Sequence, residues 1–86
     1  MFKVIVHKRA AHELETLSKL NRQQILNELE EMRVDPFSGD VKPLKPLKGL
    51  FRKRIGDCRI IFAVNFQEEE VVVFKIGRRE SVYEGI

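Results

Sequence analysis

The chain has 86 residues, of which 43% are hydrophobic and 34% charged, and its formal net charge is +3. Such a length fits one small domain with a thin core, and the composition is that of a globular chain, neither disordered nor embedded in a membrane. No apolar run approaches the ~20 residues of a membrane span, and the chain opens on a strand-like segment instead of a signal peptide. The single cysteine, Cys58, cannot form an internal disulfide, which agrees with a reducing compartment. We therefore expect one domain over residues 1–86, located in the cytoplasm.

The positive charge is concentrated in one segment of the chain. Residues 1–41 hold six Lys or Arg against seven Asp or Glu, a net charge of −1. Residues 42–59 hold seven Lys or Arg against one Asp, a net charge of +6. This asymmetry within one domain is typical of a nucleic-acid-binding surface, although a solvated basic face is an alternative of equal weight on charge alone.

The first residues predict a strand followed by a helix. Residues 2–7 alternate apolar side chains at Phe2, Val4 and Val6, a pattern typical of a strand. From Arg9 the apolar period becomes helical. The expected apolar stripe of this helix is Ala10, Ala11, Leu14 and Leu17.

A second helix is expected between Asn21, as its N-cap, and Asp35-Pro36, which closes it. Gln24 would be the capping-box partner of Asn21. The expected buried stripe is Ile25, Leu26, Leu29 and Met32. Because the connection between the two helices is very short, we predict a helical hairpin with both apolar faces turned to one sheet.

The segment from Pro36 to Leu50 contains all three prolines and predicts an irregular connection. Lys42, Lys45 and Lys48 recur within it at a spacing of three. In an extended, polyproline-like path these lysines would share one side.

Three strands are expected in the rest of the chain, at Phe51–Ile55, Cys58–Phe66 and Val71–Gly77. Gly56-Asp57 and Gln67–Glu70 are short enough for hairpin turns. The predicted fold class is α+β: an N-terminal strand, a helical hairpin, then a three-strand antiparallel meander, forming one sheet with the helices packed on one face.

Three arginines fall on one face of the first predicted hairpin. Side chains alternate along a strand, so Arg52 and Arg54 share a face, and a two-residue turn brings Arg59 opposite Arg54. We expect all three guanidinium groups to stand together on the solvent side. Lys53 falls on the core side and is expected to reach to the edge of the sheet, with its stem packed against apolar neighbours.

This cluster suits a phosphodiester. Like charges directly opposite on a sheet destabilise by roughly 0.2–1 kcal/mol per pair, so folding alone does not favour them. Guanidinium groups bind phosphate through paired hydrogen bonds. The alternative is that the arginines pair with surface carboxylates such as Glu80 or Glu84.

Several of these segments together resemble a known family. Lys45-Pro-Leu-Lys-Gly49, the segment Phe51-Arg-Lys-Arg-Ile-Gly-Asp-Cys-Arg-Ile-Ile-Phe62, and Val71-Val-Val-Phe-Lys-Ile-Gly-Arg-Arg79 followed by Val82-Tyr83 are similar to the RelE/ParE superfamily of toxins. The resemblance covers most of the chain, since the predicted opening strand and helical hairpin also fit.

The resemblance implies a toxin of a type II toxin–antitoxin system, neutralised by a RelB-like antitoxin. The RelE branch implies a metal-independent endoribonuclease, without cofactors, that cuts messenger RNA in the ribosomal A site. The ParE branch implies poisoning of DNA gyrase, and a catalytically degenerate protein of the same fold is a third possibility. Because the nuclease residues align, we rank the RelE reading first.

The resemblance also assigns residues. The positions that match catalytic residues of the RelE branch are Arg52, Arg54, Arg59, Arg79 and Tyr83. Further basic residues expected to contact RNA are Lys45, Lys48, Lys53, Lys75 and Arg78. The chain departs from the family at Cys58, where tyrosine is usual, and in carrying arginine in place of a lysine proposed as general base.

Arginine fits only part of this chemistry. RNA cleavage by the 2′-hydroxyl needs a base, stabilisation of the phosphorane charge, and a proton for the leaving 5′-oxygen. Arginine stays protonated at neutral pH and cannot serve as the base. The arginines therefore predict phosphate binding and charge stabilisation, with Lys53 and Lys75 as weak candidates for the base.

Overall fold

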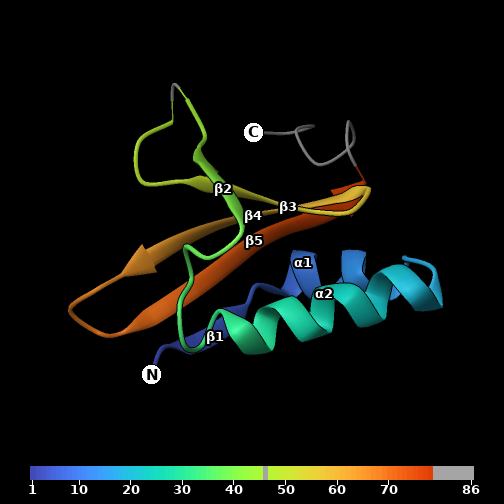
Figure 1. The fold of residues 1–86 in the computed structure, drawn as a ribbon, viewed down its shortest axis with the longest axis horizontal. Helices are drawn as coiled ribbons and strands as arrows, with labels where there is room; N and C mark the ends of the chain where they lie inside the picture. Colours follow the sequence, from blue (N-terminus) through green and yellow to red (C-terminus); the bar gives the residue numbers. More distant parts are fainter. Residues whose placement is uncertain (46, 79–86) are drawn as a thin grey trace.

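Two helices pack on one face of a five-stranded sheet in this computed structural model, which describes residues 1–45 and 47–78 (Figure 1). In chain order the elements are β1 (Lys3–Val6), α1 (Lys8–Glu15), α2 (Lys19–Glu31), β2 (Asp40–Pro43), β3 (Phe51–Ile55), β4 (Cys58–Asn65) and β5 (Glu70–Arg78). The strand order is β1-β5-β4-β3-β2, with β1 parallel to β5 and the other pairs antiparallel. The predicted α+β class, the helical hairpin and the antiparallel meander are confirmed.

The strand β2 was not predicted and corrects the expected irregular connection. Asp40 lies opposite Arg54 and Pro43 opposite Phe51. This strand is at the edge of the sheet and has a neighbouring strand on one side only. Pro43, which has no N–H to donate, is tolerated in such an edge strand. Lys42 belongs to β2, whereas Lys45 and Lys48 follow in turns, so the three lysines do not form one polyproline-like run.

The start of α2 also differs from the prediction. Ser18, not Asn21, is the N-cap, and the Ser18 hydroxyl accepts a hydrogen bond from the Asn21 backbone N–H at 3.2 Å. The hydroxyl therefore satisfies one of the free N–H groups at the helix start.

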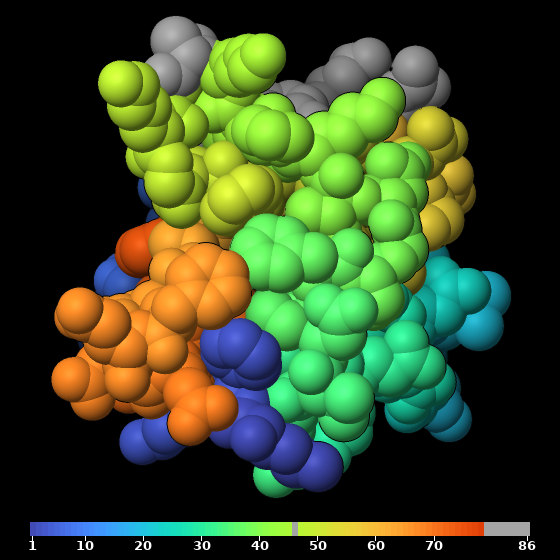
Figure 2. Space-filling model, turned by 60° about the vertical axis from the view of Figure 1, so that its left-hand side comes forward, coloured from blue at the N-terminus to red at the C-terminus, as the bar shows by residue number. Residues whose placement is uncertain are grey.

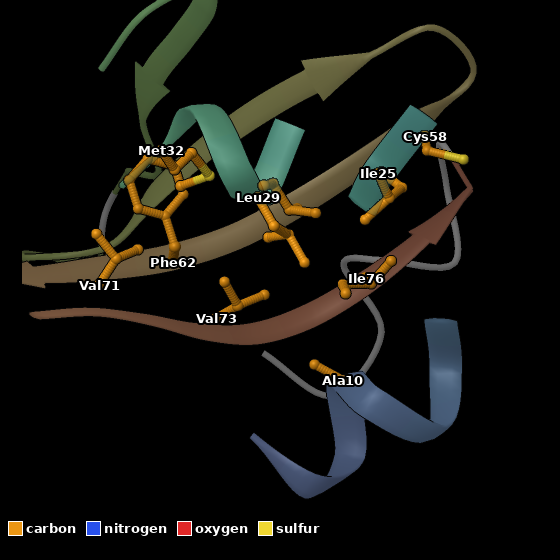
Figure 3. Packing of buried hydrophobic residues seen from close by; sticks show 10 residues of the cluster. Ala10, Ile25, Leu29, Met32, Cys58, Phe62, Val71, Val73 and Ile76 are labelled. Atoms are coloured by element: carbon orange, nitrogen blue, oxygen red, sulfur yellow. The ribbon is translucent and has the colours of Figure 1, made fainter. Parts of the chain in front are cut away.

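The core lies between the sheet and the two helices (Figure 3). Its fully buried side chains are Ala10, Ile25, Met32, Ile60, Phe62, Val71 and Val73, with Cys58, Ile76 and Leu29 nearly so. Two residues expected in the apolar set are not buried, since Leu26 is 43% and Phe66 65% exposed.

Phe66 lies just beyond the end of β4, where the sheet gives way to a turn. Its ring contacts those of Phe2, at 6.2 Å, and Phe37, at 6.0 Å between centroids. Figure 2 shows this end of the molecule, where the β4–β5 turn, the N-terminus and the segment after α2 meet. Phe66 thus covers an aromatic cluster from outside instead of entering the core.

Two irregularities set which side chains share a face. Gly56, at φ 57°, forms with Asp57 the tight β3–β4 turn, and this left-handed conformation favours glycine. The β4–β5 pairing shifts between Ile61 and Phe62, so that Phe62 lies opposite Val73 while Ile61 lies opposite Lys75. A bulge of this kind reverses the alternation along β5.

Among the described residues, no helix is long and apolar enough to cross a membrane.

Candidate nucleic-acid interface

The side of the sheet away from the helices, here the open face, carries basic residues from neighbouring strands. One row across the sheet is Asp40, Arg54, Arg59 and Gly77. The next row is Lys42, Arg52, Ile61 and Lys75. The expected pairing of Arg54 with Arg59 is confirmed by the β3–β4 register.

The three arginines of these rows differ in exposure. Arg54 is exposed, whereas the Arg52 side chain is only 14% exposed and Arg59 is 8% exposed. Arg59 Nη1 donates to the Cys58 carbonyl at 3.2 Å, which uses one of the five N–H donors of the guanidinium. The three arginines do share the side of the sheet away from the helices, as expected, but Arg54 is exposed to solvent there while Arg52 and Arg59 are largely buried.

Arg52 has a carboxylate partner that sequence reasoning missed. Its Nη2 lies 3.4 Å from Asp40 Oδ1, on the neighbouring strand. Glu80 and Glu84, the partners considered from the sequence, lie outside the described residues, as do Arg79 and Tyr83. The polar–apolar–polar run Asp40-Val41-Lys42 was the one sequence signal for β2, and the prolines nearby obscured it.

Lys53 lies on the opposite side of the sheet from the arginines, as its parity predicted, but it does not reach the edge. It is 1% exposed, and its Nζ lies 2.8 Å from Glu28 Oε1 on α2. Nζ makes no well-directed hydrogen bond to a described group. Lys53 is therefore enclosed beneath the helices and does not share a surface with the arginines.

Lys75 and Arg78 lie on opposite sides of the sheet, although both belong to the end of β5. The register places Lys75 on the open face beside Ile61, where it is 4% exposed. Arg78 lies opposite Cys58, on the helix side, and lines a cavity of about 460 Å³ with Glu13 and Ser18. Arg78 therefore does not face the same surface as Arg54 and Arg59.

Lys45 and Lys48 are exposed in the β2–β3 connection, which extends to the side of the sheet away from the helices (Figure 1). With Leu47 and Phe51 they line a mainly apolar hollow of about 470 Å³. Their position leaves them accessible to a ligand on the open face, and their role stays a prediction.

Cys58 has the environment of a structural residue. It is 1% exposed, and burial raises the pKa of its thiol, an effect that Asp57 strengthens and that Arg78 and Arg59 oppose. A thiol held in its protonated form is a poor nucleophile. Within residues 1–45 and 47–78, no group of three or more His, Cys, Asp or Glu side chains is arranged to hold a metal ion.

Comparison with known proteins identifies the family. Residues 4–83 match the family described as ParE toxin of type II toxin-antitoxin system, parDE. The chain is 31% identical over 85 residues to the RelE1 protein of Methanocaldococcus jannaschii, covering 95% of this chain and 94% of that relative.

Solved structures of similar proteins have the same fold as this chain. In the archaeal RelE–RelB complex from Pyrococcus horikoshii, the similar chain is 26% identical with a TM-score of 0.79, over 92% of this chain and 96% of that one. The toxin–antitoxin complex RelBE2 from Mycobacterium tuberculosis contains a chain that is 21% identical with a TM-score of 0.82, over 91% of this chain and 98% of that one.

The chain thus has the fold of a class of toxins, in which a helical hairpin packs on one face of a mixed sheet. In this chain the other face of the sheet carries rows of basic residues. The chain belongs to the RelE/ParE superfamily of type II toxin–antitoxin toxins.

Proposed function

We propose that this toxin is a ribosome-dependent endoribonuclease that cuts messenger RNA in the ribosomal A site, without a metal or cofactor, and so inhibits translation in the cytoplasm. The observation that carries the proposal is the pairing of Arg54 with Arg59 on the open face, flanked by Lys42 and Arg52. Side chains paired across strands lie close enough to contact one phosphate together.

The chemistry that these groups supply is electrostatic. In-line attack of a 2′-hydroxyl on phosphorus concentrates negative charge on the non-bridging oxygens of the phosphorane. Arg59 is oriented before RNA arrives, because it is 8% exposed and its guanidinium is held by the Cys58 carbonyl. Arg54, being exposed, is free to capture the backbone first. Arg79 and Tyr83 would act at the leaving group and on the stacked base, as the family resemblance implies.

A RelB-like antitoxin is the proposed protein partner. Two of the similar structures are complexes of RelE with RelB. The described surface includes apolar side chains suited to a protein partner, among them Phe66, Val34 and Met1, which are 65%, 69% and 80% exposed. The hydrogen bond from the Phe2 N–H to the Arg33 carbonyl, at 2.7 Å, holds the N-terminus next to the segment that bears Val34.

Primer extension on messenger RNA from a reconstituted translation reaction tests the nuclease proposal. The unmodified protein should produce cuts within the A-site codon, and Arg54→Ala, Arg79→Ala and Tyr83→Ala should abolish or greatly weaken them. Arg33→Ala is the matched control, because Arg33 is an exposed arginine on the helix side, paired with Glu30 at 2.8 Å. The absence of A-site cuts with the unmodified protein would overturn the proposal.

Gyrase poisoning is the second candidate, because the matching family carries the ParE name. A supercoiling assay with purified gyrase distinguishes the two functions. Loss of supercoiling at toxin concentrations that leave messenger RNA intact would favour the ParE-like activity.

A further inference from the structure

The arginines of the open face cannot perform one step of the proposed reaction, the removal of the proton from the 2′-hydroxyl. Cleavage begins when a base removes the proton from the 2′-hydroxyl. Guanidinium groups cannot do so near neutral pH, because arginine stays protonated there. Lys53 is enclosed beneath the helices and paired with Glu28, so it cannot reach RNA on the open face. Lys75 belongs to the open face but is 4% exposed and lies opposite Ile61, one strand further from Arg54 than Asp40 is.

The strand β2 brings a carboxylate to the arginines. Asp40 lies directly opposite Arg54, which in turn lies opposite Arg59, so the three residues form one line across β2, β3 and β4. Residues opposite each other on neighbouring strands have their Cβ atoms about 4.5–5.5 Å apart. A phosphate held by Arg54 would therefore place an adjoining ribose within reach of Asp40.

The Asp40 carboxylate is accessible, and within residues 1–45 and 47–78 its side chain has one charged partner, Arg52. Its side chain is 47% exposed, and its contact with Arg52 is 3.4 Å, longer than the roughly 2.7–2.9 Å of a strong charge-assisted hydrogen bond. A carboxylate has about four lone-pair sites, and this contact occupies one of them. The contact is long and the carboxylate is half exposed, so the pairing with Arg52 leaves Asp40 open to a ligand.

Other described carboxylates near these strands are less suitable. Glu70 shares the open face but lies opposite Asn65, six residues along β4 from Arg59 and so about 20 Å away. Asp57 lies in the β3–β4 turn, and its charge acts on the helix-side thiol of Cys58.

We propose that Asp40 is the general base of the reaction, an inference that rests on the proposed nuclease function. The carboxylate takes the proton as the 2′-O–H bond breaks, and the 2′-oxygen bonds to phosphorus. The bond from phosphorus to the 5′-oxygen breaks, leaving a 2′,3′-cyclic phosphate on one fragment. The 5′-oxygen takes up a proton from water or from an acid on the protein. Arg52 orients the carboxylate, while Arg54 and Arg59 hold the phosphate.

Single-turnover cleavage of messenger RNA on programmed ribosomes tests this assignment. Asp40→Asn keeps the shape of the side chain and should lower the maximal rate about 100-fold or more, which is the usual contribution of a general base. The toxin concentration at half-maximal rate should change by less than about threefold, because Asn removes no phosphate contact. Asp40→Glu, which restores a carboxylate, should cleave faster than Asp40→Asn.

Asp57→Asn is the matched control, because it removes one exposed carboxylate near the same hairpin and should leave the rate unchanged. Thermal unfolding of each variant checks that it is folded.

The outcomes separate the two proposals. If the unmodified protein cleaves and Asp40→Asn keeps more than about a tenth of its rate, or weakens binding alone, the assignment of Asp40 is overturned while the nuclease function stands. If the unmodified protein does not cleave, the nuclease function fails and the role of Asp40 fails with it.

Discussion

Lys53 and Glu28 join the third strand to the second helix through an ion pair, with Nζ and Oε1 2.8 Å apart. The Lys53 side chain is 1% exposed and that of Glu28 25% exposed, so the ammonium is enclosed while the carboxylate keeps partial contact with water. A buried ammonium that loses its partner is strongly destabilising, because its desolvation is no longer compensated.

We predict that Glu28→Gln lowers the free energy of unfolding by about 2 kcal/mol, less than the roughly 3–5 kcal/mol of a fully buried pair because Glu28 is partly exposed. Lys53→Met should cost less, since the apolar chain fills the same space and Glu28 can turn to water. Urea denaturation measures both. The double variant should be more stable than Glu28→Gln alone, and a double variant less stable than either single one would contradict this account.

Cys58 gives a prediction about pH. Its pKa is raised by burial above the ordinary value of 9.0, so the folded state favours the protonated thiol and the unfolded state ionises first. The resulting contribution to stability is present in full below about pH 9 and decreases as the pH rises through the pKa of the folded state.

The comparison of unmodified protein with Cys58→Ala tests this sign, because other groups that titrate in the same range are common to both. The difference in free energy of unfolding between the unmodified protein and Cys58→Ala should decrease above about pH 9. Reaction of the native thiol with a thiol reagent at pH 7.5 should be slow, and rapid after denaturation. A difference that grows with pH would mean that folding lowers the pKa of the thiol, and rapid labelling of the native protein would mean that the thiol is accessible; either result would contradict the prediction.

The sequence predicted the elements with a strong local signal and missed those that depend on tertiary context. The order of strands and helices and the pairing of Arg54 with Arg59 follow from periodicity and turn length, both of which are local. The strand β2 was missed because Pro43 argues against a strand unless the strand is known to lie at an edge.

The site was predictable in its charge but not in its pairing. Strand parity placed Lys53 on the side away from the arginines, but only the packed structure shows that Glu28 stabilises its charge there. The bulge at Ile61/Phe62 decides which side of β5 bears Lys75, and no local pattern marks it. Asp40 could not be related to the arginines before β2 was known.

Electrostatic binding of RNA should depend most on the exposed member of the arginine pair. Arg54→Gln should weaken binding to a single-stranded RNA and reduce the slope of log affinity against log salt by about 0.7, the value for one lost phosphate contact. Fluorescence anisotropy over a series of salt concentrations gives this slope. Arg33→Gln removes an equal charge from the helix side and should leave the slope unchanged. Equal effects of the two variants would mean that RNA does not bind on the open face.

The most direct measurement uses ribosomes programmed with two messenger RNAs that differ only in one 2′-hydroxyl within the A-site codon. The unmodified protein should cut the normal message after the nucleotide that bears this hydroxyl and leave a 2′,3′-cyclic phosphate. It should not cut at the 2′-deoxy position. Equal cutting of both messages, or no cutting of either, would contradict the proposal that this toxin is a nuclease acting through the 2′-oxygen.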